Sequence, residues 1–278
     1  MRRATLALLL VLGQTMVHAE TPAERGAYLV RGPMGCGNCH TPMGPAGFIA
    51  DQELGGRLVQ ELPEFTAYAP NITPASEIAG WSDADLARAI REGIRPDGSL
   101  IGPPMPIGMY RGLSDTDVNA IVAFLRTLRA VENEVPESTY NIPLPPSYGP
   151  PVGHVPDVPH GATAEYGAYL AGPVAHCLEC HTPMGPNGFM LDTDLGRGGF
   201  VFDGPWGRSV SANITNGPDG LAEYTDDQIK AMITEGKHAD GTPMMPPMPY
   251  PFLAKMTPED LDAIVRYLRT LPYLPDRS

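Results

Sequence analysis

Long apolar runs, cysteine and basic side chains are all scarce in this sequence. Beyond the N-terminus no stretch of roughly 18 or more residues is continuously apolar, so we expect no transmembrane anchor. The 19 lysines and arginines are outnumbered by 32 aspartates and glutamates, which gives a formal net charge of −13. This balance argues against nucleic acid or an anionic membrane as a partner. The 4 cysteines all fall within two short motifs.

The N-terminus has the pattern of a secretory signal peptide. Two arginines near the start precede an apolar run over residues 4–11, which is too short to span a bilayer comfortably. A small-residue cleavage site follows and ends at Ala19. We therefore predict that residues 1–19 are a signal peptide and that the mature protein is exported, most simply into a bacterial periplasm.

The cysteines form the motif Cys-x-x-Cys-His, which occurs twice. The residues of the two copies are Cys36, Cys39, His40, Cys177, Cys180 and His181. Positions three apart share a face of a helical turn, so the two sulfurs of each copy can point the same way. This spacing is the attachment pattern of a c-type haem, in which the sulfurs form thioethers and the histidine ligates the iron. The motifs therefore predict two covalently attached haem c groups.

Three other interpretations of the motifs fit the sequence less well. A zinc site needs further thiolate or nitrogen ligands, and no second cysteine pair stands near either copy. A disulfide within each motif is compatible with export but leaves the adjacent histidine without a role. A thioredoxin-like redox motif requires a surrounding βαβ pattern, which the sequence lacks.

The two motifs belong to a repeat that covers most of the chain. Three phrases recur 141 or 142 residues apart, which indicates duplication of a whole domain. They are Gly-Ala-Tyr-Leu at 26 and 167, His-Thr-Pro-Met-Gly-Pro at 40 and 181, and Asn-Ile-Thr at 71 and 213. A proline-rich stretch separates the copies, and its composition predicts a semi-rigid linker. We predict domains over residues 20–131 and 163–278, with residues 132–162 as the linker.

Within each half the sequence predicts short helices. Ser82 and Thr225 are suited to cap helices over residues 83–92 and 226–235, each followed by a glycine. Ser114 and Thr257 precede runs with an apolar stripe at helical spacing. Because strand-like alternation is nearly absent, we predict an all-α fold for both domains.

A methionine in a proline-rich loop is the predicted second iron ligand of each half. Met105 and Met248 both stand in the sequence Pro-Pro-Met-Pro, at equivalent places in the repeat. Flanking prolines restrict the loop and reduce the entropy lost when a sulfur is held against iron. The alternatives are that these residues only fill the core, or that another methionine ligates the iron: Met43, Met109, Met184, Met244 or Met245.

Other polar residues have weaker predicted roles. Asn71, Asn213 and the indole of Trp81 are candidates to hydrogen-bond haem propionates, and loop capping is an equal alternative for the asparagines. Several histidines do not repeat and are expected on the surface: His154, His160, His176 and His238.

Each half resembles a class I cytochrome c domain, with an early helix, Cys-x-x-Cys-His, a methionine loop and a closing amphipathic helix. The resemblance implies that the first and last helices cross, with Gly26 against Phe124 and Gly167 against Tyr267. The phrases Asn-Ile-Thr, Gly-Trp-Ser-Asp-Ala-Asp-Leu and Pro-x-Met-Pro are similar to those of cytochrome subunits of periplasmic alcohol, gluconate and aldehyde dehydrogenases. Those relatives commonly carry three haems, whereas this sequence has two motifs.

The resemblance implies electron transfer and no substrate chemistry of the chain's own. Two irons with both axial positions filled offer no open site to a substrate. The expected donor is a periplasmic dehydrogenase, and the expected acceptor is another cytochrome or a terminal oxidase. The alternative is a dihaem enzyme, either peroxidase-like or thiosulfate-oxidising, which needs an open iron position or a cysteine ligand.

Overall fold

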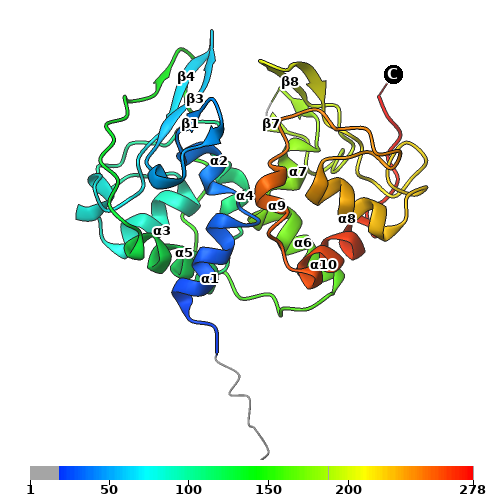
Figure 1. Ribbon diagram of the computed structural model, residues 1–278, viewed down its shortest axis with the longest axis horizontal. Helices are drawn as coiled ribbons and strands as arrows, with labels where there is room; N and C mark the ends of the chain where they lie inside the picture. The colour runs from blue at the N-terminus through cyan, green and yellow to red at the C-terminus, as the bar shows by residue number, and fades with distance from the viewer. Residues whose placement is uncertain (1–18, 187, 278) are drawn as a thin grey trace, which may run out of the picture.

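The chain folds into two similar halves that lie side by side (Figure 1). The computed structural model describes residues 19–186 and 188–277, so the predicted signal peptide lies outside the described residues except for Ala19. Within those two ranges, no helix is both long enough and apolar enough to cross a membrane.

The first half contains short helices and, between them, small strands. In chain order they are α1 (Pro22–Arg31), α2 (Cys36–His40), β1 (Met43–Gly44), β2 (Gly47–Phe48), η1 (Ala50–Gln52), β3 (Arg57–Leu62), β4 (Phe65–Ala69), η2 (Glu77–Gly80), α3 (Asp83–Glu92), α4 (Ile107–Tyr110) and α5 (Asp115–Thr127). The following segment adds strand β5 (Thr139–Tyr140).

The second half repeats this order with small changes. Its elements are α6 (Ala164–Tyr169), the π-helical turn η3 (Leu170–Val174), α7 (Cys177–Cys180), β6 (Met184–Gly185), β7 (Gly188–Phe189), β8 (Val201–Gly204), β9 (Gly207–Val210), α8 (Asp226–Glu235), α9 (Tyr250–Leu253) and α10 (Pro258–Leu268). The shared order is that expected of a duplication.

The predicted caps delimit the helices. The Ser82 hydroxyl accepts a hydrogen bond from the Asp85 N–H, and the Asp85 carboxylate accepts one from the Ser82 N–H. Gly93 ends α3 in the left-handed conformation, with φ of 67°. Thr225 and Gly236 bound α8 in the same way. The predicted limits of both helices are confirmed.

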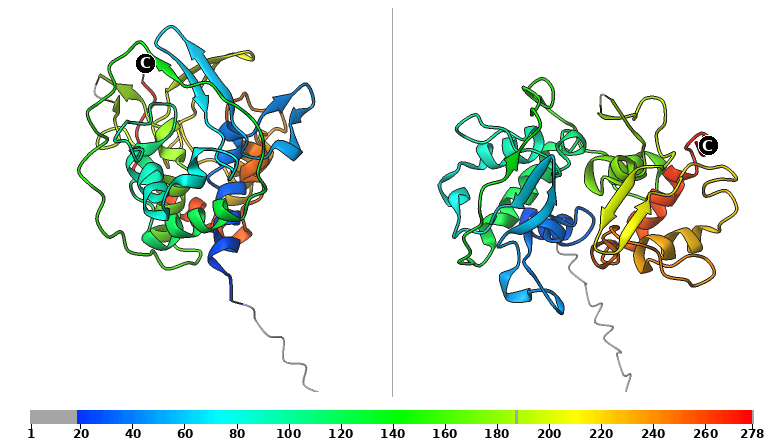
Figure 2. Two further views of the ribbon diagram at one scale, coloured as in Figure 1. Left: turned by 90° about the vertical axis from the view of Figure 1, so that its left-hand side faces the viewer. Right: turned by 90° about the horizontal axis from the view of Figure 1, so that it is seen from above.

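The all-α prediction is wrong, because small antiparallel sheets accompany the helices. The pairs are β1–β2, β6–β7 and β8–β9, and β4 lies between β3 and β5. In β4, Ala67 and Ala69 are buried while Tyr68 between them is partly exposed, an alternation too short to stand out in the sequence. The β3–β4 and β8–β9 hairpins lie at the same end of the molecule, away from α1 (Figures 1 and 2).

The first and last helices of each half cross at a glycine. A Cβ on Gly26 would lie 1.9 Å from the Ala120 carbonyl oxygen and 2.7 Å from Phe124 Cβ. A Cβ on Gly167 would lie 2.8 Å from Tyr267 Cβ. Both predicted glycine–aromatic contacts are therefore confirmed, and the crossing leaves no room for a side chain at either glycine.

The two halves are joined by a reciprocal pair of buried contacts. Tyr28 of α1 donates a hydrogen bond to the Asp260 carboxylate at the start of α10. Its repeat equivalent Tyr169 donates to Asp117 at the start of α5, at 2.7 Å. Asp117 also accepts two hydrogen bonds from the Arg25 guanidinium, at 2.8 and 3.0 Å. The halves thus meet through equivalent surfaces, in the manner of a two-fold symmetric dimer.

Replacing the crossing glycine should destabilise the fold. Gly26→Ala should lower the free energy of unfolding by about 1–3 kcal/mol or more, because the methyl group forces α1 away from α5. Gly108→Ala is the matched control, since a Cβ at Gly108 meets no atom within 4 Å. Chemical denaturation of both variants measures the difference, and equal stability of the two would contradict the crossing.

Candidate functional site

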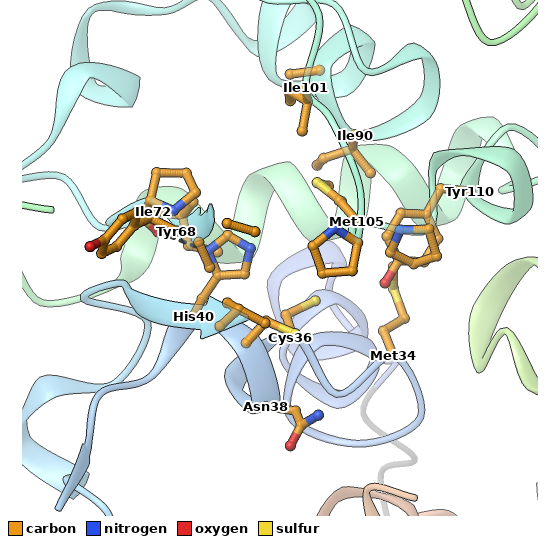
Figure 3. Close-up of a pocket in the computed structure, with 18 of the residues that line it drawn as sticks. Met34, Cys36, Asn38, His40, Tyr68, Ile72, Ile90, Ile101, Met105 and Tyr110 are labelled. Atoms are coloured by element: carbon orange, nitrogen blue, oxygen red, sulfur yellow. Dashed lines mark hydrogen bonds between the residues drawn. The ribbon is translucent and has the colours of Figure 1, made fainter. Parts of the chain in front are cut away.

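The first Cys-x-x-Cys-His motif borders a mostly apolar cavity in the first half. Gly35 precedes α2 in the left-handed conformation, with φ of 58°. Cys36, Cys39 and His40 line the cavity, and Met105 lines it from the loop before α4. Figure 3 shows Cys36 and His40 reaching the cavity from α2 and Met105 entering from that loop. The structure therefore brings together the four residues predicted for the first site.

A backbone carbonyl orients each motif histidine. Nδ1 of His40 lies 2.8 Å from the Pro70 oxygen, and Nδ1 of His181 lies 2.7 Å from the Ala212 oxygen. Because a carbonyl oxygen only accepts, Nδ1 carries the hydrogen and Nε2 keeps its lone pair for a metal. Burial lowers the pKa of both imidazoles and so favours their neutral form. Neither carbonyl can be recognised in the sequence, because every residue type has a backbone carbonyl.

Two tyrosines of the predicted linker hold the methionine loop of the first half. Tyr140 Oη donates to the Pro103 carbonyl at 2.9 Å, and Tyr148 Oη donates to the Ile101 carbonyl at 2.7 Å. A Cβ on Gly102 would lie 2.3 Å from the Tyr140 ring, so this glycine allows the close approach. Tyr140 also lines the cavity. The segment between the halves therefore contributes to the first site, which its composition alone did not indicate.

The second half holds its methionine loop differently. Met248 is partly buried and packs against the hydrophobic core. Ser209 of β9 donates a hydrogen bond to the Pro246 carbonyl at 2.7 Å. The β8–β9 hairpin thus takes the place that the linker tyrosines have in the first half.

Three of the competing methionines are open to solvent. Met43 and Met184 are each 53% exposed, and Met245 is 51% exposed. An exposed thioether gains little by leaving water for a buried iron site, and none of the three lines the first cavity. Exposure therefore favours Met105 and Met248 over these alternatives.

The four motif cysteines are half-buried, and their surroundings disfavour the thiolate form. Burial raises the pKa of Cys36 to about 12 and that of Cys177 to about 11. None of the four cysteines forms a disulfide in the structure. In the described parts of the chain, no three His, Cys, Asp or Glu side chains gather as ligands for a metal ion. A redox role for the thiols themselves is disfavoured, because thiol exchange requires the thiolate.

Each of the two repeated asparagines caps its own loop and ties it to the segment that follows the closing helix. The Asn71 amide donates to the carbonyls of Val131 and Asn133, and its oxygen accepts from the N–H and the hydroxyl of Thr73. Asn213 also makes four hydrogen bonds: its amide donates to the Leu274 carbonyl and the Asp276 carboxylate, and its oxygen accepts from the N–H and the hydroxyl of Thr215. An amide has two donor hydrogens and two acceptor lone pairs, so both groups are fully used. These hydrogen bonds favour loop capping over a propionate contact for both asparagines. Trp81, by contrast, lines the first cavity.

The donor set fits a covalently attached haem. Two thiols border one cavity with an imidazole whose Nε2 is free and a thioether from a second element. Apolar side chains supply much of the remaining wall, among them Ile72, Ile90 and Leu125. Such walls exclude water and suit a large flat hydrophobic group.

A substitution at Asn71 separates the two roles considered for it. Asn71→Ala should lower the free energy of unfolding by about 1–3 kcal/mol, because buried partners lose their hydrogen bonds. The reduction potential of the first site should not move. Asn141→Ala is the control, since Asn141 is exposed and donates to the Pro63 carbonyl alone. A shifted potential with unchanged stability would instead support a propionate contact.

Comparison with known proteins identifies relatives over nearly the whole chain. The cytochrome c family matches residues 23–129 and again residues 164–272. The fructose dehydrogenase cytochrome subunit of Gluconobacter japonicus is 30% identical over an alignment that covers 95% of this chain and 57% of that protein. The cytochrome c subunit of a quinone alcohol dehydrogenase of Gluconobacter oxydans is 28% identical, over 92% of this chain and 56% of its own length.

A diheme cytochrome c-type protein of Cereibacter sphaeroides is 27% identical over 97% of each chain. This chain therefore spans little more than half of the two dehydrogenase subunits but nearly all of the diheme protein. The twofold family match agrees with the two motifs, the two methionine loops and the two glycine crossings. The chain belongs to the cytochrome c family.

Proposed function

We propose that this chain is an exported dihaem c-type cytochrome that passes single electrons from a dehydrogenase to a downstream cytochrome or oxidase. The observation that carries the proposal is the first cavity, which is bordered by the attachment motif and by a methionine from a separate loop. The same residue types recur at equivalent positions of the second half.

In this proposal each residue has a distinct part in holding the haem. Cys36 and Cys39 anchor it through thioethers, and His40 and Met105 provide the axial ligands; Cys177, Cys180, His181 and Met248 do so in the second half. A haem supplies reversible one-electron chemistry at iron, and methionine–histidine ligation raises its potential relative to bis-histidine ligation. The carbonyl of Pro70 holds the His40 ring, and Tyr140 and Tyr148 hold the methionine loop. These tethers keep the ligands in place in both redox states.

The proposal assigns electron transfer to the chain and leaves substrate chemistry to a partner. An iron with two protein ligands has no open position for a peroxide or other substrate, which disfavours the dihaem-enzyme alternative. The dehydrogenase subunits among the relatives support a dehydrogenase as the electron donor. Export to the periplasm rests on the predicted signal peptide.

Replacing either axial methionine should change the potential of one haem. Met105→His and Met248→His should each keep covalent haem but lower the potential of their own site by roughly a tenth to a few tenths of a volt. Met245→His is the control, because Met245 is exposed, lies three residues before Met248 and has no ligand role in this proposal. Spectroelectrochemical titration measures all three variants. Unchanged potentials in both ligand variants would show that other groups ligate the irons.

The spin state of the oxidised protein tests the enzyme alternative independently. Two filled axial positions should give low-spin ferric signals from both haems in electron paramagnetic resonance. A high-spin signal from one haem at neutral pH would indicate an open iron position. That result would overturn the electron-transfer proposal in favour of a dihaem enzyme.

A further inference from the structure

The cavity of the first half is closed in part by the second half. His176 and Pro249 both line it, although both belong to the second half. The prediction that His176 is a surface residue is therefore wrong, because the neighbouring half covers it. His176 directly precedes Cys177 of the second attachment motif, and Pro249 directly follows Met248 of the second methionine loop. In Figure 1, α7 and α9, which adjoin these residues, lie at the boundary that faces α4. The residues that flank the second site therefore form part of the wall of the first.

His176 has an unusual backbone for this position. Its φ of 41° lies in the left-handed region, which is unfavourable for a residue with a Cβ. The repeat equivalent is Gly35, which adopts the same region without strain, with φ of 58°. Glycine would form this turn without strain, so the presence of histidine indicates that its ring has a role. Backbone strain of this kind persists only where the surrounding structure enforces it.

The His176 ring packs against a buried wall residue of the first cavity. It meets the Tyr110 ring edge to face, with centroids 6.0 Å apart and planes at 78°. Tyr110 is 5% exposed and lines the same cavity. Burial lowers the pKa of His176 to about 4 and so favours the neutral ring, whose Nδ1 lies 4.0 Å from the Glu179 carboxylate. The ring therefore closes the cavity without adding a charge to it.

Contacts between the halves hold this wall in place. Phe252 of α9 packs on α2, where a Cβ on Gly37 would lie 3.0 Å from its ring. Helix α4 contacts η3 of the second half, and a Cβ on Gly112 would lie 2.7 Å from Pro173. Together with the reciprocal tyrosine–aspartate hydrogen bonds, these contacts fix the orientation of one half relative to the other. The His176 ring is thus presented to the first cavity by a packed surface.

We infer that the first haem site is shared between the two halves, and that His176 is a positioning residue that seals the first haem from water. The inference rests on the proposed function, because it concerns how this chain would hold its first haem. Excluding water disfavours the more highly charged ferric state, so the seal raises the potential of the first haem. A residue next to the second attachment site thereby sets a property of the first.

The test is the potential of each haem in His176→Gly. Glycine suits the left-handed backbone, so the variant should fold with unchanged or higher thermal stability. At a fixed applied potential near its midpoint, the oxidised-to-reduced ratio of the first haem should rise about threefold or more as water enters. The oxidised-to-reduced ratio of the second haem should change less, although its attachment motif directly follows His176 in the sequence. The first haem is identified as the one whose potential moves in Met105→His.

Two further variants make the outcome decisive. His238→Gly removes an exposed histidine of the second half outside the cavity and should move neither potential. His176→Asn tolerates the left-handed backbone but is shorter than histidine, and it should shift the first haem in the same direction. If His176→Gly is unstable, the potentials of His176→Asn provide the test instead.

The possible failures are distinguishable. If both haems are attached and low-spin but neither potential moves, or the second alone moves, the shared site is wrong and the proposed function stands. If the unsubstituted protein lacks two attached low-spin haems, the proposed function itself fails. The inference then fails with it.

Discussion

The close crossing of the first and last helices in each half is the constraint on which the rest of the structure depends. At Gly26 and Gly167 the helix backbones approach so closely that a methyl group would overlap a carbonyl oxygen. This approach brings the end of α1 and the apolar face of α5 together at the cavity, and it sets the start of α2 at its edge. The short attachment helix has little stability of its own, since it spans residues 36–40. Its position therefore comes from the crossing.

Duplication allowed the two halves to share one interface. Tyr28 and Tyr169 are repeat equivalents, and each donates a hydrogen bond to an aspartate in the first turn of the closing helix of the opposite half. The Arg25 guanidinium and the Asp117 carboxylate are both buried there, with side chains 9% and 5% exposed. This ion pair lies within the first half, but Arg25 donates to the Tyr166 hydroxyl at 3.3 Å and Asp117 accepts from Tyr169 at 2.7 Å, so the pair also anchors the second half. Removing one member would leave an uncompensated charge at the interface. Fixed geometry between the halves is what permits residues of one half to complete the cavity of the other.

Much of the candidate site was predictable because its chemistry is carried by side chains at set spacings. The motif cysteines and histidines, Met105 and the caps at Ser82 and Thr225 follow from local rules of helices and metal ligands. What the sequence could not show acts through the main chain or through distant contacts. The carbonyl of Pro70 and the tether from Tyr140 leave no local signal. The hairpins were missed because their strands are short and one face is only partly buried. Pairing with the adjacent strand of the hairpin, not propensity, stabilises them.

The most direct test of this account is the intact mass of the purified protein, measured after denaturation together with alkylation of its thiols. The account predicts a polypeptide that carries the added mass of two haem groups, with none of its four cysteines open to alkylation. A polypeptide without that added mass, or one with all four thiols reactive, would contradict it.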